Sequence, residues 1–122
     1  MVMAGLRMYV ITVTGTLVEV EPDNWRACTN QWNLVAYGKS RLEADLRMDY
    51  AVSMMLRSMF KRMPRSEFRN ALKKAGARLR TQSFTSATRG EVSRRAEYTT
   101  SDIETARRVN FRRDAMVVGA NS

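Results

Sequence analysis

The segment between Ser40 and Pro64 constrains the fold of this chain more than any other. Ser40 followed three residues later by Glu43 is a capping box, in which two side chains satisfy backbone N–H groups at the start of a helix. Apolar residues then recur at spacings of three and four, as on one face of a helix. Proline cannot continue a helix, so Pro64 is expected to end it. The pattern predicts a long, methionine-rich helix over about residues 41–63.

The N-terminal region has the period of a β-strand. Residues 7–14 alternate and are rich in β-branched side chains, and after Gly15 the alternation resumes over residues 16–21. A glycine in such a run marks either a bulge or a turn, so either a bulged long strand or a tight hairpin fits. Pro22 is expected to close this strand region.

Two further helices are predicted on either side of the long one. Asp23 can cap a helix that ends at Gly38, and its expected apolar face consists of Trp25, Cys28, Trp32 and Val35. A shorter helix is expected from Ser66 or Glu67 to Gly76. Its apolar face carries Phe68, Leu72 and Ala75, and its opposite face is basic.

The C-terminal part is predicted to return to β-structure and then to a helix. Residues 77–84 and 91–98 have extended patterns and are expected to form a basic β-hairpin. A second capping box, Ser101 with Glu104, predicts a helix to about Asn110 or Arg113, and the apolar tail 115–118 can pair as a strand. The expected fold is therefore one α+β domain over residues 1–122, with an N-terminal strand or bulged hairpin, three helices, a basic hairpin and a C-terminal helix.

The residue types present exclude most catalytic machinery. The chain contains no histidine, which removes the commonest general base and metal ligand, and its one cysteine, Cys28, is expected in the core. The glycines are scattered, so no phosphate-binding loop is formed. We expect no enzyme activity, no cofactor, no metal and no small-molecule substrate. With no disulfide possible and no apolar run of about 20 residues, we expect a reducing intracellular compartment, the cytoplasm or a virus particle, and no membrane partner.

Two carboxylates lie on the otherwise apolar side of the long helix. Asp45 and Asp49 are four residues apart and therefore project together. Buried carboxylates need partners. A metal held with Glu43 is disfavoured because Glu43 points nearly the opposite way. We predict pairing with Arg41, with arginines of the second half, or with another subunit.

Positive charge is concentrated in the second half. The net charge of the chain is +9, and residues 51–122 hold 16 Lys and Arg against 6 Asp and Glu. Such an excess creates a field that attracts phosphates. The candidate nucleic-acid-binding residues are Arg57, Lys61, Arg62, Arg65, Arg69, Lys73, Lys74, Arg78, Arg80, Arg89, Arg94 and Arg95.

Two functions fit these patterns. The first is a non-enzymatic, basic nucleic-acid-binding protein that acts mainly through phosphate contacts, with DNA and RNA both open. The alternative is an oligomeric structural or assembly subunit, such as a virion, connector or ribosome-type component, that packs through its methionine-rich helix. Homo-oligomerisation is expected through Met48, Met54, Met55 and Met59, because methionine-rich surfaces adapt to partners.

Overall fold

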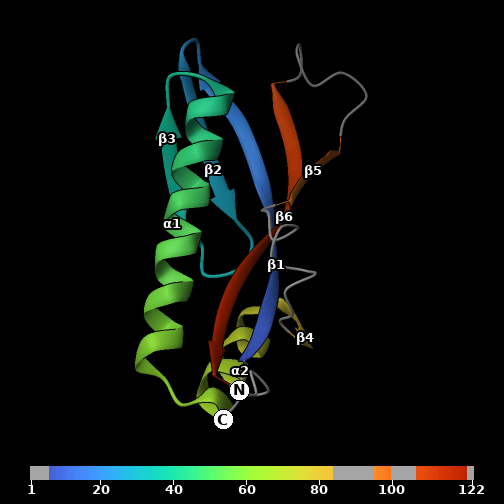
Figure 1. Ribbon diagram of the computed structural model, residues 1–122. Coiled ribbons are helices and arrows are strands. Elements are labelled where there is room, and N and C mark those ends of the chain that lie inside the picture. Colours follow the sequence, from blue (N-terminus) through green and yellow to red (C-terminus); the bar gives the residue numbers. More distant parts are fainter. Residues whose placement is uncertain (1–5, 84–94, 100–106, 121–122) are drawn as a thin grey trace.

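The described part of the protein is an antiparallel sheet with two helices. The computed structural model describes residues 6–83, 95–99 and 107–120. In chain order the elements are β1 (Leu6–Glu21), β2 (Asn24–Thr29), β3 (Val35–Gly38), α1 (Arg41–Arg62), α2 (Arg65–Ala75), β4 (Arg78–Ser83), β5 (Arg95–Thr99) and β6 (Arg108–Ala120). The strand order is β3-β2-β1-β6-β5, and β4 pairs with β1 (Figure 1).

Strand β1 organises the sheet. Along one edge it pairs with β6 from Leu6 to Val18. Along the other edge it pairs first with β4 and then with β2, from Gly15 onward. At the change of partner, the Gln31 side chain accepts a hydrogen bond from the Thr14 backbone N–H at 2.9 Å. The Gln31 side chain thus satisfies the part-buried Thr14 N–H, which lies between the last residue of β1 that pairs with β4 and the first that pairs with β2.

The glycine in the middle of β1 is explained by close packing. Gly15 neither turns nor ends the strand, so the long strand is confirmed over the hairpin, and the register irregularity falls later, between Glu19 and Glu21. A Cβ at Gly15 would lie 2.2 Å from the Cys28 carbonyl oxygen and 2.6 Å from the Phe111 ring. Only glycine lets β2 and the aromatic ring approach this closely.

The predicted helix from Asp23 to Gly38 is wrong, because that segment forms β2 and β3. Turns with positive φ at Asp23 (59°), Trp32 (61°) and Asn33 (52°) reverse the chain on either side of β2. The three-and-four spacing of aromatic and apolar residues was not a helical face. In the strand, Trp25 and Ala27 face the helices, whereas Cys28 lies on the other side of the sheet.

Helices α1 and α2 were predicted from the residues at their ends, and the structure confirms both helices. Ser40 Oγ accepts the Glu43 N–H at 3.1 Å, and Glu43 Oε1 accepts the Lys39 N–H at 3.2 Å. Helix α2 starts after Pro64 and ends at Gly76, whose φ of 82° is left-handed. Local residues therefore determine where both helices begin and end.

The predicted basic hairpin and C-terminal helix are wrong. Residues 78–83 and 95–99 are strands, but β4 pairs with β1 and β5 pairs with β6. Strand β6 occupies the described part of the predicted C-terminal helix, while its start, Ser101 to Glu104, lies outside the described residues. Within β6 every second residue from Val109 to Val117 is buried, and the residues that alternate with them are exposed or half-buried. This period of two outweighs the capping signal upstream.

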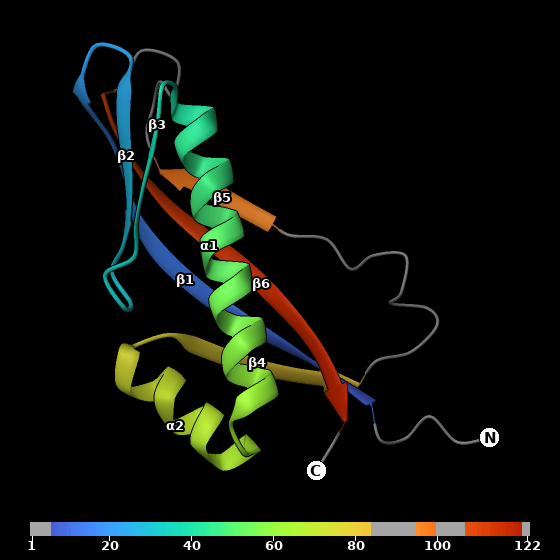
Figure 2. The ribbon, with the colours of Figure 1, turned by 90° about the vertical axis from the view of Figure 1, so that its left-hand side faces the viewer.

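The core lies between the helices and one face of the sheet. Helix α1 runs along this face, and α2 lies near β4 (Figure 2). Tyr9 of β1 packs against the rings of Phe60 and Phe68, with centroid distances of 5.2 and 6.3 Å. Met48 and Met59, expected at a subunit interface, are buried in this core. No helix in the described part of the chain is long and apolar enough to cross a membrane.

Candidate nucleic-acid interface

The sheet register brings arginines from distant segments to one face. Arg78 and Arg80 of β4 align with Thr12 and Val10 of β1, and Arg112 of β6 aligns with Thr14. Directly opposed residues in a sheet project to the same side. All three arginines therefore project from the face turned away from the helices, and all three are exposed.

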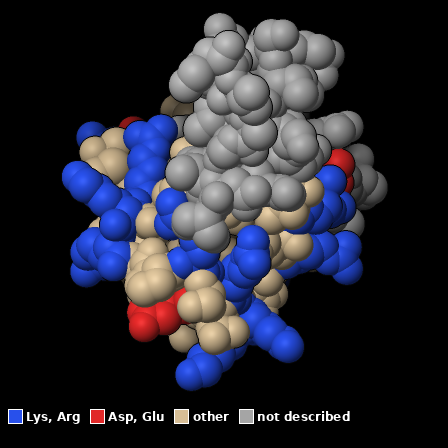
Figure 3. Space-filling view, turned by 60° about the horizontal axis from the view of Figure 1, so that its bottom comes forward, with Lys and Arg blue, Asp and Glu red and all other residues tan. Residues whose placement is uncertain are grey.

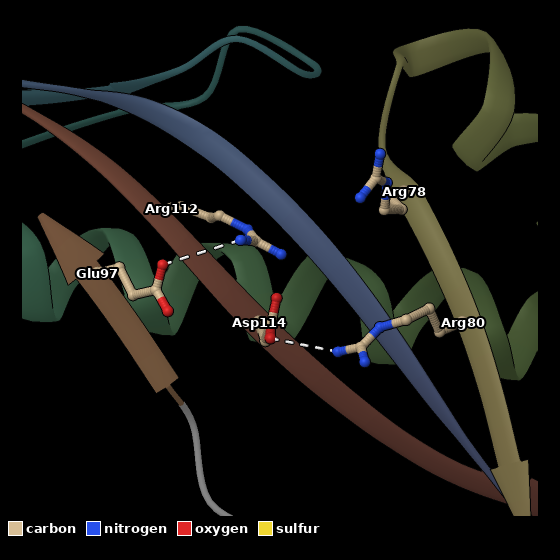
Figure 4. A pocket seen from close by; sticks show the side chains of 5 residues that line it. All are labelled: Arg78, Arg80, Glu97, Arg112 and Asp114. Carbon is tan, nitrogen blue, oxygen red and sulfur yellow. Dashed lines mark hydrogen bonds and ion pairs between the residues drawn. The ribbon is translucent and has the colours of Figure 1, made fainter. Parts of the chain in front are cut away.

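These arginines surround a hollow of about 340 Å³. Its lining consists of Arg78, Arg80, Glu97, Arg112 and Asp114 (Figure 4). Arg80 pairs with Asp114 at 3.5 Å, and Arg112 pairs with Glu97 at 3.8 Å. Both arginine side chains are about half exposed, so these pairs contribute little stability and leave guanidinium donors open to solvent. The Arg78 guanidinium forms no ion pair with a carboxylate of the described residues.

A second hollow, of about 450 Å³, adjoins the first at Arg78. Arg69 and Lys73 of α2 contribute its cationic lining, together with Arg78. We call Arg69, Lys73, Arg78, Arg80 and Arg112 the basic surface. Figure 3 shows Lys and Arg side chains gathered over this end of the molecule, with few acidic ones between them. Because Arg78 lines both hollows, the basic surface continues from α2 across β4 to β6.

The remaining predicted site residues lie elsewhere. Arg57, Lys61 and Arg62 are exposed on α1, Lys74 is exposed on α2, and none of them lines either hollow. Arg89 and Arg94 lie outside the described residues, and Arg95 begins β5.

Arg65 is a packing residue as well as a predicted contact. Its guanidinium lies 3.6 Å from the Phe60 ring centroid and donates to the Phe60 carbonyl oxygen at 3.0 Å. Cation–π and hydrogen-bond contacts of this kind fix the side chain on the end of α1. Arg65 is therefore less available to a phosphate than the exposed members of the basic surface.

Sequence reasoning missed Arg112, which completes the basic surface. The residue lay in the segment predicted as the last helix. A signal was present, because Arg108, Asn110 and Arg112 alternate with buried apolar residues at a period of two. A strand there would have placed Arg112 on a polar face, although not beside β4.

On the opposite face of the sheet, a buried ionic cluster joins α1 to β5 and β6. Asp45 Oδ1 forms an ion pair with Arg113, and Asp45 Oδ2 accepts a hydrogen bond from the Tyr98 hydroxyl. Asp49 Oδ1 lies 3.4 Å from Arg113 Nη1. The prediction that these aspartates pair with an arginine of the second half is confirmed. Burial, reinforced by the hydrogen bond to Asp45, raises the pKa of Tyr98 above 10.0.

Comparisons with models of protein families, with curated proteins and with solved structures found no match for this chain. The basic surface is therefore the feature of this chain that indicates a function.

Proposed function

We propose that this protein binds nucleic acid, without catalysis, through phosphate contacts of the basic surface. The observation that carries the proposal is the position of Arg78. It lines both hollows and forms no ion pair with the described carboxylates, so it offers a complete guanidinium between α2 and β6. A guanidinium of this kind matches the oxygens of a phosphate bidentately.

The charge balance of the basic surface supports a polyanionic ligand. Its five cations face two carboxylates, Glu97 and Asp114. These carboxylates hold Arg112 and Arg80 over the hollow in ion pairs whose arginine side chains are about half exposed. A phosphate can replace Glu97 at small cost because its side chain is 57% exposed, whereas Asp114 is 16% exposed and also accepts a hydrogen bond from the Thr12 hydroxyl at 2.7 Å. The surface thus favours several phosphates bound together over one isolated anion.

The residues of the basic surface favour recognition of the phosphate backbone over recognition of the bases. Phosphate contacts position a protein on nucleic acid but carry no sequence information. The lining of the first hollow is entirely charged, and the apolar residues that line the second, Ala77 and Leu79, are aliphatic, so neither hollow offers an aromatic ring on which a base could stack. We therefore propose binding with little sequence preference and with a steep dependence on salt.

The test compares an Arg78→Ala/Arg112→Ala double variant with the wild type by fluorescence anisotropy. Short single- and double-stranded DNA and RNA are the ligands, at several salt concentrations. If both arginines contact phosphates, the slope of log K against log salt falls by about 1.4 to 1.8. Folding should hardly change, since exposed substitutions stay within about 0.5 kcal/mol.

An Arg62→Ala variant is the matched control, because Arg62 is an exposed arginine of α1 that lines neither hollow. Its salt slope should equal that of the wild type. If the wild type binds none of the four ligands at low salt, the nucleic-acid proposal fails. If the control loses as much affinity as the double variant, diffuse net charge and not the basic surface determines binding.

The second candidate function, a subunit of an assembly, is favoured by a different observation. Helix α1 presents large apolar side chains to solvent on the side away from the sheet. Surfaces of this kind commonly mark contacts with other protein chains.

A further inference from the structure

The outward side of α1 carries a continuous apolar ridge. We call Leu42, Leu46, Tyr50 and Met54 the α1 ridge; their exposed fractions are 63, 60, 67 and 47%. The four residues follow one another at a spacing of four, which is the line along which ridges of packed helices interdigitate. Such a ridge exposes on the order of 400 Å² of apolar surface, typical of a binding patch.

Two opposite charges lie at equal distances in sequence from Tyr50, the third residue of the ridge. Glu43 lies seven residues before Tyr50 and Arg57 seven residues after it. Seven residues are close to two helical turns, so both side chains lie on the same side of α1 as Tyr50. Glu43 Oε1 accepts a hydrogen bond from the Lys39 N–H and forms an ion pair with Arg47, each at 3.2 Å. Arg57 is exposed and forms no ion pair with any described residue.

We propose that a second copy of this chain docks on the α1 ridge, with the two α1 helices antiparallel about a two-fold axis at Tyr50. This arrangement sets Glu43 of each copy against Arg57 of the other, twice in one contact. It also sets Leu46 beside Met54 of the second copy. A two-fold contact requires a surface that is complementary to itself; Glu43 and Arg57 provide this complementarity in charge, and Leu46, Tyr50 and Met54 provide it in apolar contacts.

The charges select the antiparallel arrangement over the parallel one. In a parallel pair, Glu43 would meet Glu43 and Arg57 would meet Arg57, and like charges at close range disfavour docking. The size of the ridge sets the strength of the contact. It is about half of the roughly 800 Å² per partner of a standard interface, so the dimer should be weak, with a Kd in the micromolar range.

The test measures the dissociation constant of the dimer by sedimentation velocity after nuclease treatment. Concentrations from about 1 to 200 μM bracket the expected Kd. Arg57→Glu places Glu against Glu43 at both symmetric contacts and should weaken the dimer about tenfold. The Glu43→Arg/Arg57→Glu double variant restores opposite charges and should return the Kd to near the wild-type value. Tyr50→Ser should weaken the dimer more than Arg57→Glu does, because it removes the large side chain at the two-fold axis.

An Arg62→Glu variant is the matched control, since it changes the same charge on α1 away from the ridge, and its Kd should be unchanged. A wild type that stays monomeric throughout this range overturns the proposal. So does a double variant that associates no better than Arg57→Glu, because the antiparallel pairing requires the rescue. Circular dichroism of each variant separates lost docking from lost folding. Nucleic-acid binding by folded Arg57→Glu tests the basic surface separately.

Discussion

Replacing Asp45 should destabilise the protein more than replacing Asp49, although both carboxylates contact the same arginine. Asp45 is buried, with 7% of its surface exposed, and both of its oxygens are bonded, one to Arg113 and one to the Tyr98 hydroxyl. Asp45→Ala removes the acceptor of one buried donor, Arg113, and one half-buried donor, the Tyr98 hydroxyl. Breaking such a contact should cost about 2 to 4 kcal/mol of unfolding free energy.

Asp49→Ala should cost about 1 kcal/mol. The Asp49 side chain is 13% exposed, and its contact with Arg113 is longer, at 3.4 Å. Without Asp49 the cluster retains one carboxylate and one guanidinium in contact, whereas without Asp45 it loses the shorter ion pair and the tyrosine hydrogen bond.

Urea unfolding at pH 7, followed by far-ultraviolet circular dichroism, measures both costs. An Arg113→Met variant and the Asp45→Ala/Arg113→Met double variant complete a thermodynamic cycle. The double variant should be less destabilised than the sum of the single ones, since Asp45→Ala leaves Arg113 without its shorter ion pair only when Arg113 is present, whereas the loss of the Asp49 contact is the same in both Arg113→Met variants. If Asp45→Ala unfolds within about 0.5 kcal/mol of the wild type, the cluster is solvated and this reasoning is wrong.

Two further substitutions test the sheet and its ionisable tyrosine. Gly15→Ala should lower the free energy of unfolding by about 3 kcal/mol, because the added Cβ would overlap the Cys28 carbonyl oxygen and the Phe111 ring. Urea unfolding measures this loss, and a value below about 1 kcal/mol would contradict the packing at Gly15. The raised pKa of Tyr98 means that the folded state holds this proton more tightly than the unfolded chain does. Its stabilising effect is therefore present below pH 10.0 and is lost as pH rises through the folded-state pKa. Between about pH 9 and 11 the wild type should lose more stability than Tyr98→Phe, and parallel losses would show that Tyr98 is not responsible.

The parts predicted correctly have signals that act over a few residues. Helices α1 and α2 are bounded by Ser40, Pro64 and Gly76, each of which acts on its own turn of backbone. The long strand β1 follows from its alternation, which no competing helical pattern opposed. The failures came where one local signal was consistent with two structures. A residue such as Asp23 caps a helix or occupies a tight turn, and only the pairing of the following strand with β1 decided for the turn.

The same division holds for the candidate site. Exposed cations at Arg69, Lys73, Arg78 and Arg80 were predicted from charge density alone. Arg112 joins them only because β6 and β4 pair with opposite edges of the same stretch of β1.

The sequence by itself determined the charge of this protein, the lack of histidine chemistry and the ends of its two helices, because these depend on composition or on neighbouring residues. Tertiary structure alone decided which strands are neighbours and which faces their side chains share. Strand pairing joins residues as distant as Leu6 and Ala120, and a shift of one residue would turn every side chain to the other face. The register that places Arg78 and Arg112 on the same face, and Asp45 against Arg113, follows from packing α1 and the sheet around one core.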